Sequence, residues 1–213
     1  VAMPCYASDI IKLAQEEVGY KEKQSNDQLY DKEANAGNKN WNKYADWITK
    51  NYPNFYNGRK GGSPWCDIFV DYLFLKCFGY KDALRLLCQP EKSLGAACRY
   101  SLKYYKRQGR FDKEPKIGSQ IFFNDAAGVS HHTGIVENFD STKVYTIEGN
   151  QGNEVCRKTY SRNYNRIAGY GHPEYDDSTP ANNGEDDSVE ERVLHINVDS
   201  SKYDTVKLTI IKE

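Results

Sequence analysis

The chain has 213 residues, of which 38% are hydrophobic and 13% aromatic, and its formal net charge is −1. This is enough for one full domain with a core plus a small appendage. The near-neutral charge argues against bulk electrostatic capture of nucleic acid or of an anionic surface. No run approaches the ~20 apolar residues of a membrane span, and the start of the chain, which is Val1, shows no signal-peptide pattern.

Two amphipathic helices are predicted before Pro53. Ser8 is the expected N-cap of the first, which Gly19 ends. Polar sequence follows to Asn40. The second helix places four apolar residues on one face: Trp41, Tyr44, Ala45 and Ile48.

A third helix is predicted to begin beside a cysteine. Ser63 is the expected N-cap, Pro64 suits the first helical position, and Cys66 then falls in the first turn. Free amide groups and the positive end of the helix dipole stabilise a thiolate there, so Cys66 is a candidate nucleophile. The stretch that follows is apolar on nearly every side, as in a buried helix, and Gly79 is expected to end it. The alternative is that Cys66 is one more small buried residue.

A fourth helix is predicted from Ser93 to Gln108. After it the spacing of apolar residues changes from the helical period of 3.6 to the strand period of 2. Helices followed by antiparallel strands predict an α+β fold. The strands are expected at 121–123, 133–136 and 144–147. Beyond a main domain of residues 1–173, we expect an acidic linker at 174–188. Residues 189–213 would form a short β tail or the start of a truncated module.

A hairpin between the last two strands would complete a catalytic site. If its turn is centred on Asp140, Glu137 lies opposite Lys143, and Glu148 lies opposite His132. Asn150 then shares the face of His132 and Glu148, because side chains alternate along a strand. A nucleophile, a base and a group that orients the base are the parts of a thiol mechanism.

The remaining histidines and cysteines show no such pattern. His131 is expected on the opposite face of its strand from His132, and no zinc-ligand spacing joins the four histidines and six cysteines. Cys66 and Cys77 would lie on one helix and cannot pair. Pairing is left open for the other five positions: Cys5, Cys77, Cys88, Cys98 and Cys156.

The chain resembles the CHAP family, the cysteine, histidine-dependent amidohydrolases and peptidases of bacterial and phage cell-wall lysis. Three blocks within residues 8–173 carry the resemblance. They are Pro64-Trp65-Cys66-Asp67-Ile68-Phe69-Val70, then Gly118-Ser119-Gln120-Ile121-Phe122-Phe123 leading to His132-Thr133-Gly134-Ile135-Val136, then Ile147-Glu148-Gly149-Asn150.

The resemblance implies a papain-like fold and peptidoglycan as the substrate. Cys66 would attack an amide carbonyl, His132 would act as base and then acid, Glu148 would orient His132, and Asn150 would help to polarise the site. Some members carry an acidic calcium loop before the cysteine, whereas residues 54–64 hold no carboxylate, so we expect no calcium there and no other cofactor. Such an enzyme would be secreted or associated with the cell wall.

Three alternatives remain open. An NlpC-type endopeptidase is disfavoured, because that family prefers Asp-Cys-Ser around the nucleophile and a histidine as third polar residue. A wall-binding or secretion-system component that kept the fold without catalysis is disfavoured by the intact Cys, His and Glu set. Nucleic-acid binding through the basic, tyrosine-bearing stretch 99–116 has little support, since one amphipathic helix explains that stretch.

Overall fold

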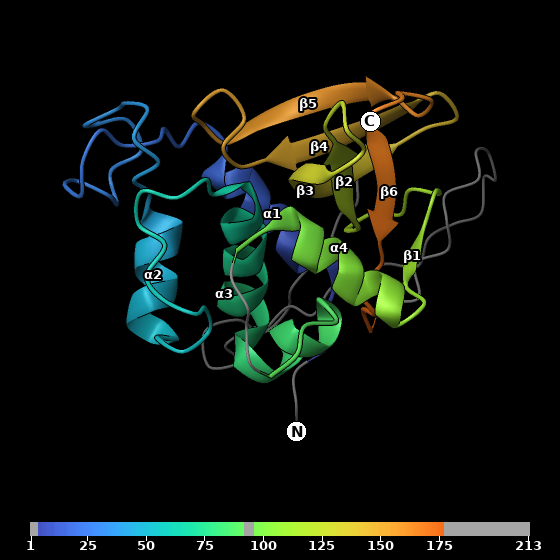
Figure 1. Cartoon of the computed structure of the whole chain (residues 1–213), viewed down its shortest axis with the longest axis horizontal. Helices are drawn as coiled ribbons and strands as arrows, with labels where there is room; N and C mark the ends of the chain where they lie inside the picture. The colour runs from blue at the N-terminus through green and yellow to red at the C-terminus, as the bar shows by residue number, and fades with distance from the viewer. Residues whose placement is uncertain (1–3, 92–95, 177–213) are drawn as a thin grey trace, which may run out of the picture. The chain divides into compact units, whose positions relative to one another are not determined.

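The computed structural model of the chain describes residues 4–91 and 96–176. Within these ranges four helices are followed by an antiparallel sheet of six strands, which confirms the predicted α+β fold (Figure 1). The helices are α1 (Ala7–Glu17), α2 (Lys43–Asn51), α3 (Cys66–Leu86) and α4 (Cys98–Arg107). The strands are β1 (Phe111–Asp112), β2 (Gln120–Asn124), β3 (Ser130–Phe139), β4 (Lys143–Glu148), β5 (Cys156–Ser161) and β6 (Ile167–Gly171). None of the helices in these ranges is long and apolar enough to cross a membrane.

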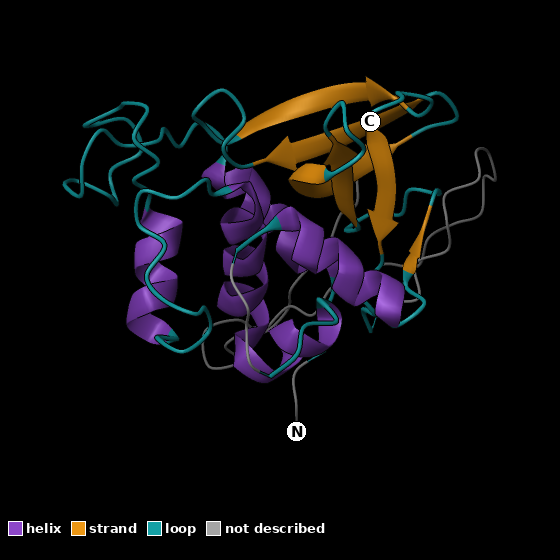
Figure 2. Ribbon diagram, in the orientation of Figure 1, coloured by secondary structure: helices purple, strands orange, loops and turns teal. Residues whose placement is uncertain are grey.

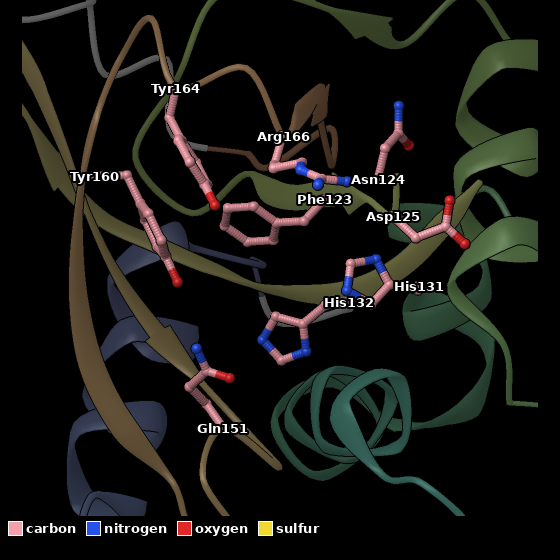
Figure 3. A pocket seen from close by; sticks show the side chains of 9 residues that line it. All are labelled: Phe123, Asn124, Asp125, His131, His132, Gln151, Tyr160, Tyr164 and Arg166. Atoms are coloured by element: carbon pink, nitrogen blue, oxygen red, sulfur yellow. The ribbon is translucent and has the colours of Figure 1, made fainter. Parts of the chain in front are cut away.

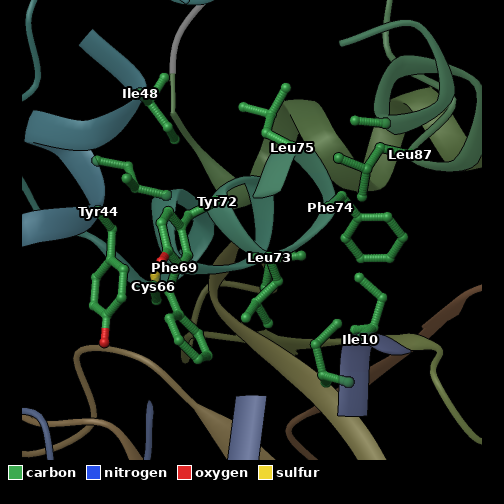
Figure 4. Packing of buried hydrophobic residues seen from close by; sticks show 14 of the residues in the cluster. Ile10, Tyr44, Ile48, Cys66, Phe69, Tyr72, Leu73, Phe74, Leu75 and Leu87 are labelled. Atoms are coloured by element: carbon green, nitrogen blue, oxygen red, sulfur yellow. The ribbon is translucent and has the colours of Figure 1, made fainter. Parts of the chain in front are cut away.

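The strands are ordered β1-β6-β2-β3-β4-β5, and α1, α3 and α4 contact β3 from one side, with α2 packed on α3 (Figure 2). The main core lies around α3, whose first three turns are buried on every side (Figure 4). Ile135 and Ile147 join this core from the sheet. Side chains of the opposite parity, such as Val136 and Phe123, form a smaller cluster. The sheet is therefore covered on the helix side and carries a second apolar surface on the other.

The helix starts differ from those predicted. α3 begins at Cys66, with Trp65 as its N-cap, so the assignment of Ser63 and Pro64 to the helix start is wrong. The buried Trp65 indole explains this, because its Nε1 donates to Glu22 Oε2 at 2.8 Å and holds the residue outside the helix. The N-cap of α1 is Tyr6, so Ser8 does not cap it.

Gly79 interrupts α3 but does not end the helical run. Its φ of 74° and ψ of 177° are not helical, and the chain turns helical again up to Leu86. A positive φ is readily adopted only by glycine, so this break was visible in the sequence. The fourth helix begins later than predicted, because Ala97 is extended and serves as the N-cap of Cys98; the predicted start, Ser93, lies outside the described residues.

Three strands were missed. β5 is an edge strand of mostly exposed polar residues, so it shows no apolar alternation. β6 contains two glycines, and a Cβ on Gly171 would lie 2.3 Å from the Tyr105 ring. Glycines in a sequence usually indicate a loop, but within a strand they allow a helix to pack closely on the sheet. β1 has only two residues.

Contacts with the main domain continue past residue 173, where that domain is predicted to end. Asp176 accepts from the Cys5 backbone N–H at 2.7 Å, and the Tyr175 hydroxyl donates to the Gly118 carbonyl at 2.8 Å. The first residues of the predicted linker thus contact the preceding domain, and the linker stays a prediction. Its remainder, 177–188, and the predicted tail at 189–213 lie outside the described residues.

Candidate active site

Cys66 is the first residue of α3, and only 7% of it is exposed. Its Sγ lies 3.6 Å from Cys98 Sγ and 3.9 Å from the His131 carbonyl oxygen. The hydrogen bond to Cys98 lowers the pKa of the Cys66 thiol. Together with a hydrogen bond to His132 and one from the Asp67 backbone N–H, it outweighs burial, which raises this pKa. The sulfur is therefore set up as a thiolate, the reactive form of cysteine.

His132 joins this thiolate to a buried carboxylate. Its Nε2 lies 2.8 Å from Glu148 Oε2, and the two side chains are 14% and 0% exposed. Burial alone would lower the pKa of His132, but hydrogen bonds to Cys66 and Glu148 raise it to about 9. Since Nε2 faces Glu148, Nδ1 is the nitrogen left for Cys66. The two shifts together favour a thiolate on Cys66 beside an imidazolium on His132.

Glu148 is itself held in place by hydroxyl groups. Thr146 Oγ1 donates to Oε1 at 2.6 Å, and the Tyr160 hydroxyl donates to Oε2 at 3.3 Å. Thr146 and Glu148 lie on one strand two residues apart, and Tyr160 comes from the neighbouring strand β5. A carboxylate with three partners keeps one orientation, so it fixes the plane of the His132 ring.

The predicted hairpin register is wrong, yet the contact it implied is present. Ile135 pairs with Ile147, and a register shift lies between Val136 and Asn138. Extending this register places Glu148 opposite Gly134, so Glu148 is a diagonal neighbour of His132. At this end of the hairpin the error amounts to two residues, which leaves His132 and Glu148 on the same face.

Two further consequences of the register follow. Glu137 is not opposite Lys143, and it pairs instead with Arg157 on β5 at 2.9 Å. Gly134 leaves the space through which the Glu148 side chain reaches His132. A Cβ on Gly134 would lie 2.5 Å from Glu148 Cγ and 2.9 Å from the Ile147 carbonyl oxygen. The His-x-Gly spacing on β3 is thus part of the site.

Cys98 is the residue that sequence reasoning missed. It is the first residue of α4, as Cys66 is of α3, and neither helix has a side-chain cap. Ser101 Oγ donates to Asp67 Oδ2 at 2.8 Å and so ties the first turns of the two helices together. Two helix N-termini therefore meet at the sulfur pair. No local pattern could reveal this, because 32 residues separate the two cysteines.

Asn150 lies beside the chain that leads into the nucleophile, and no hydrogen bond among the described residues joins it to Cys66, His132 or Glu148. In the orientation that satisfies both ends of its carboxamide, the nitrogen donates to Glu22 Oε2 at 3.0 Å. The oxygen then accepts from the Trp65 backbone N–H at 3.1 Å. The Asn150 carboxamide was predicted to lie beside the His132 ring. It contacts the backbone of Trp65, the residue before Cys66, instead.

A cavity of about 410 Å³ opens beside His132 (Figure 3). It is lined by Phe123, Asn124, Asp125, His131, His132, Gln151, Tyr160, Tyr164 and Arg166. His131 was expected on the other face of its strand, but a register shift between Phe123 and Asn124 turns it into this cavity. Cys66 does not line this cavity itself, and His132 is the residue that connects the two. Among the residues described, no three His, Cys, Asp or Glu side chains are grouped as a metal ion would require.

The fold and these contacts define a class of protein, in which a cysteine at a helix start faces a histidine and an acid on an antiparallel sheet. Residues 57–150 match the CHAP domain, which confirms the resemblance predicted from the sequence for this part of the chain. The matched segment contains Cys66, His132, Glu148 and Asn150. This segment is therefore similar to the CHAP family, a family of peptidoglycan amidohydrolases and peptidases.

Other comparisons add less. One solved structure, "The crystal structure of Ly7917", is similar with 13% identity and a TM-score of 0.46. The alignment covers 79% of this chain, and the chain spans 62% of the length of that protein. None of the curated proteins matches the chain.

Proposed function

We propose that the chain is a cysteine-dependent hydrolase that cleaves an amide bond of bacterial peptidoglycan and acts outside the cytoplasmic membrane. The observation that carries the proposal is the contact of the Cys66 thiolate with His132, which is itself held by Glu148. The CHAP match supports the substrate class. The bond is either the one joining the sugar to the stem peptide or one within the peptides.

In the first half of the reaction, Cys66 Sγ attacks the carbonyl carbon of the amide and forms a tetrahedral adduct. His132 gives the proton on Nδ1 to the amide nitrogen, the carbon–nitrogen bond breaks, and the amine leaves. The acyl group remains on Cys66 as a thioester. Because the thiolate and imidazolium exist before substrate binds, no proton has to be removed from the sulfur in this step.

In the second half, neutral His132 removes a proton from water, and the resulting hydroxide attacks the thioester carbonyl. The carbon–sulfur bond then breaks, releasing a carboxylic acid and restoring the thiolate beside the imidazolium. Glu148 stabilises the imidazolium in both halves through Nε2. Asn150 supports the reaction by holding the backbone of Trp65, so it is a positioning residue.

The test compares wall clearing by three proteins on purified peptidoglycan: wild type, Cys66→Ala and Cys77→Ala. Cys77 is a matched control because it lies on the same helix, and the hydrogen bond of its Sγ among the described residues is to the Asp9 carbonyl at 3.6 Å, away from the site. We expect Cys66→Ala to lose at least about 10⁴-fold in rate, and Cys77→Ala to clear walls like wild type. Equal clearing by wild type and Cys66→Ala would rule out the thiol mechanism.

Two readouts refine the result. Mass spectrometry of the soluble fragments identifies the new amine and carboxylate termini and so the bond that is cut. Activity in EDTA is expected to equal activity without it. Loss of activity in EDTA that calcium restores would show that the expectation of no calcium is wrong.

A further inference from the structure

The cavity beside His132 contains a positive charge that the catalytic mechanism does not use. The Arg166 guanidinium lines it, and no hydrogen bond or ion pair joins this guanidinium to another side chain in residues 4–91 and 96–176. The other arginines of the same edge of the sheet are paired: Arg157 with Glu137, and Arg162 with Glu114. A partly buried guanidinium without a partner has five donors available for a ligand.

Asp125 is the one carboxylate among the lining residues, and it interacts electrostatically with Arg166 without forming an ion pair or hydrogen bond with it. Asp125 Oδ1 accepts from the backbone N–H groups of Ala127 and Val129, both at 2.9 Å, and so closes its own turn between β2 and β3. Figure 3 shows Arg166 between Phe123 and Asn124 at the rim of the hollow that His132 also faces.

Aromatic rings form another part of the wall, from Phe123 beside Arg166 to Tyr160 and Tyr164. Tyr160 and Tyr164 are stacked, with centroids 5.6 Å apart and an angle of 13° between their planes, and Phe123 lies 4.8 Å from Tyr160. Flat aromatic surface beside a fixed cation suits a ligand with an apolar or sugar-like body and one anionic group. The Tyr160 hydroxyl also contacts Glu148, so this wall is continuous with the catalytic residues.

We propose that this cavity is a substrate subsite in which Arg166 binds a free carboxylate of the stem peptide, close to the amide bond that is cut. The proposal rests on the proposed function and names its substrate class: peptidoglycan whose stem peptide carries a carboxylate rather than a carboxamide at that position. Arginine and carboxylate match as a two-pronged pair, whereas a carboxamide offers one acceptor and no charge. Arg166 is thus a residue that determines specificity.

The experiment uses pairs of synthetic muramoyl peptides that differ only in one group, a carboxylate or a carboxamide on the second residue of the stem or on its diamino acid. With wild type we expect kcat/KM to be at least tenfold higher for the carboxylate form of one pair, mainly through KM. Arg166→Gln should lose this preference. Arg162→Gln removes the same charge from the same loop, but its partner is Glu114, so it should keep the preference.

Binding is measured separately by calorimetry with the inactive Cys66→Ala protein, with and without Arg166→Gln. If wild type cleaves both forms of every pair equally, or if Arg162→Gln loses the preference as Arg166→Gln does, the subsite is refuted while the hydrolase function stands. If wild type cleaves neither form but Cys66→Ala binds the carboxylate form more tightly and needs Arg166 to do so, the subsite stands and the catalytic proposal fails. Absence of both cleavage and preferential binding refutes the subsite.

Discussion

Cys66 and Cys77 lie on the same helix about three turns apart, and their thiols differ in acidity. Hydrogen bonds from Cys98, His132 and a backbone N–H hold the pKa of Cys66 well below its ordinary value. Burial, followed by the charge of Asp9, raises the pKa of Cys77 to about 12. The reactivity of a cysteine here depends on the groups around the sulfur and not on the helix that carries it.

After removal of Cys66 itself, the substitution with the largest expected effect on the reactivity of Cys66 is Glu148→Gln. The amide cannot stabilise the imidazolium, so we expect kcat to fall by about 100-fold or more. The pKa of His132, about 9 in the wild type, should also fall. Wild-type kcat/KM should therefore decline above about pH 9, and the variant should decline at lower pH. An unchanged basic limb in the variant would show that another group holds His132.

Gly134→Ala tests the same contact through packing. The added Cβ would meet Glu148 Cγ at 2.5 Å, so the carboxylate must move away from His132. We expect activity to fall by about tenfold or more and stability by about 1–3 kcal/mol. Gly109→Ala is the control, because it has a positive φ but open space around it, so it should cost stability and leave kcat unchanged. Equal kcat in both variants would contradict the role of Gly134.

Cys98→Ala and Cys98→Ser test whether the Cys98 thiol lowers the pKa of Cys66. Loss of the thiol donor should raise the pKa of Cys66, and so move the acid limb of kcat/KM to higher pH and lower the rate on that limb by about tenfold per pKa unit. Serine keeps a donor and should restore part of the profile. Cys156→Ala, whose Sγ contacts the Gln151 carbonyl, serves as the control. If the Cys98→Ala profile overlays that of wild type, the sulfur contact does not tune Cys66.

The smallest expected effect is on the pH dependence of stability, and it concerns Asp71, about one turn beyond Cys66 on α3. Burial raises the pKa of Asp71 from 3.8 to about 7, although Tyr56 and Gln89 donate to its carboxylate. Because the folded-state pKa is the higher one, this group's contribution is complete below about pH 4 and is lost as the pH rises to 7. The loss is on the order of a few kcal/mol. Thermal melts between pH 4 and 8 should show a shallower decline for Asp71→Asn than for wild type; parallel declines would assign the effect to other groups.

The order of helices and strands could be predicted because it depends on local patterns, such as the apolar run after Cys66 and the short apolar segments of β2, β3 and β4 between turn sequences. Edge strand β5 and glycine-containing β6 could not, since their positions depend on neighbours far along the chain. The contact of His132 with Glu148 survived a wrong register, because an error of two residues preserves the face. The exact start of α3 was missed for a tertiary reason, the buried bond between Trp65 and Glu22.

That bond has a consequence for where the working unit begins. Glu22 is 1% exposed, and its carboxylate also accepts from the backbone N–H of Asn40 at 2.7 Å. A fragment trimmed to the matched segment would delete this acceptor and strand the indole N–H of Trp65 inside the core, next to the nucleophile. A chimera that carries this domain therefore needs the N-terminal segment with Glu22 as well, although the match to the CHAP domain begins only at residue 57.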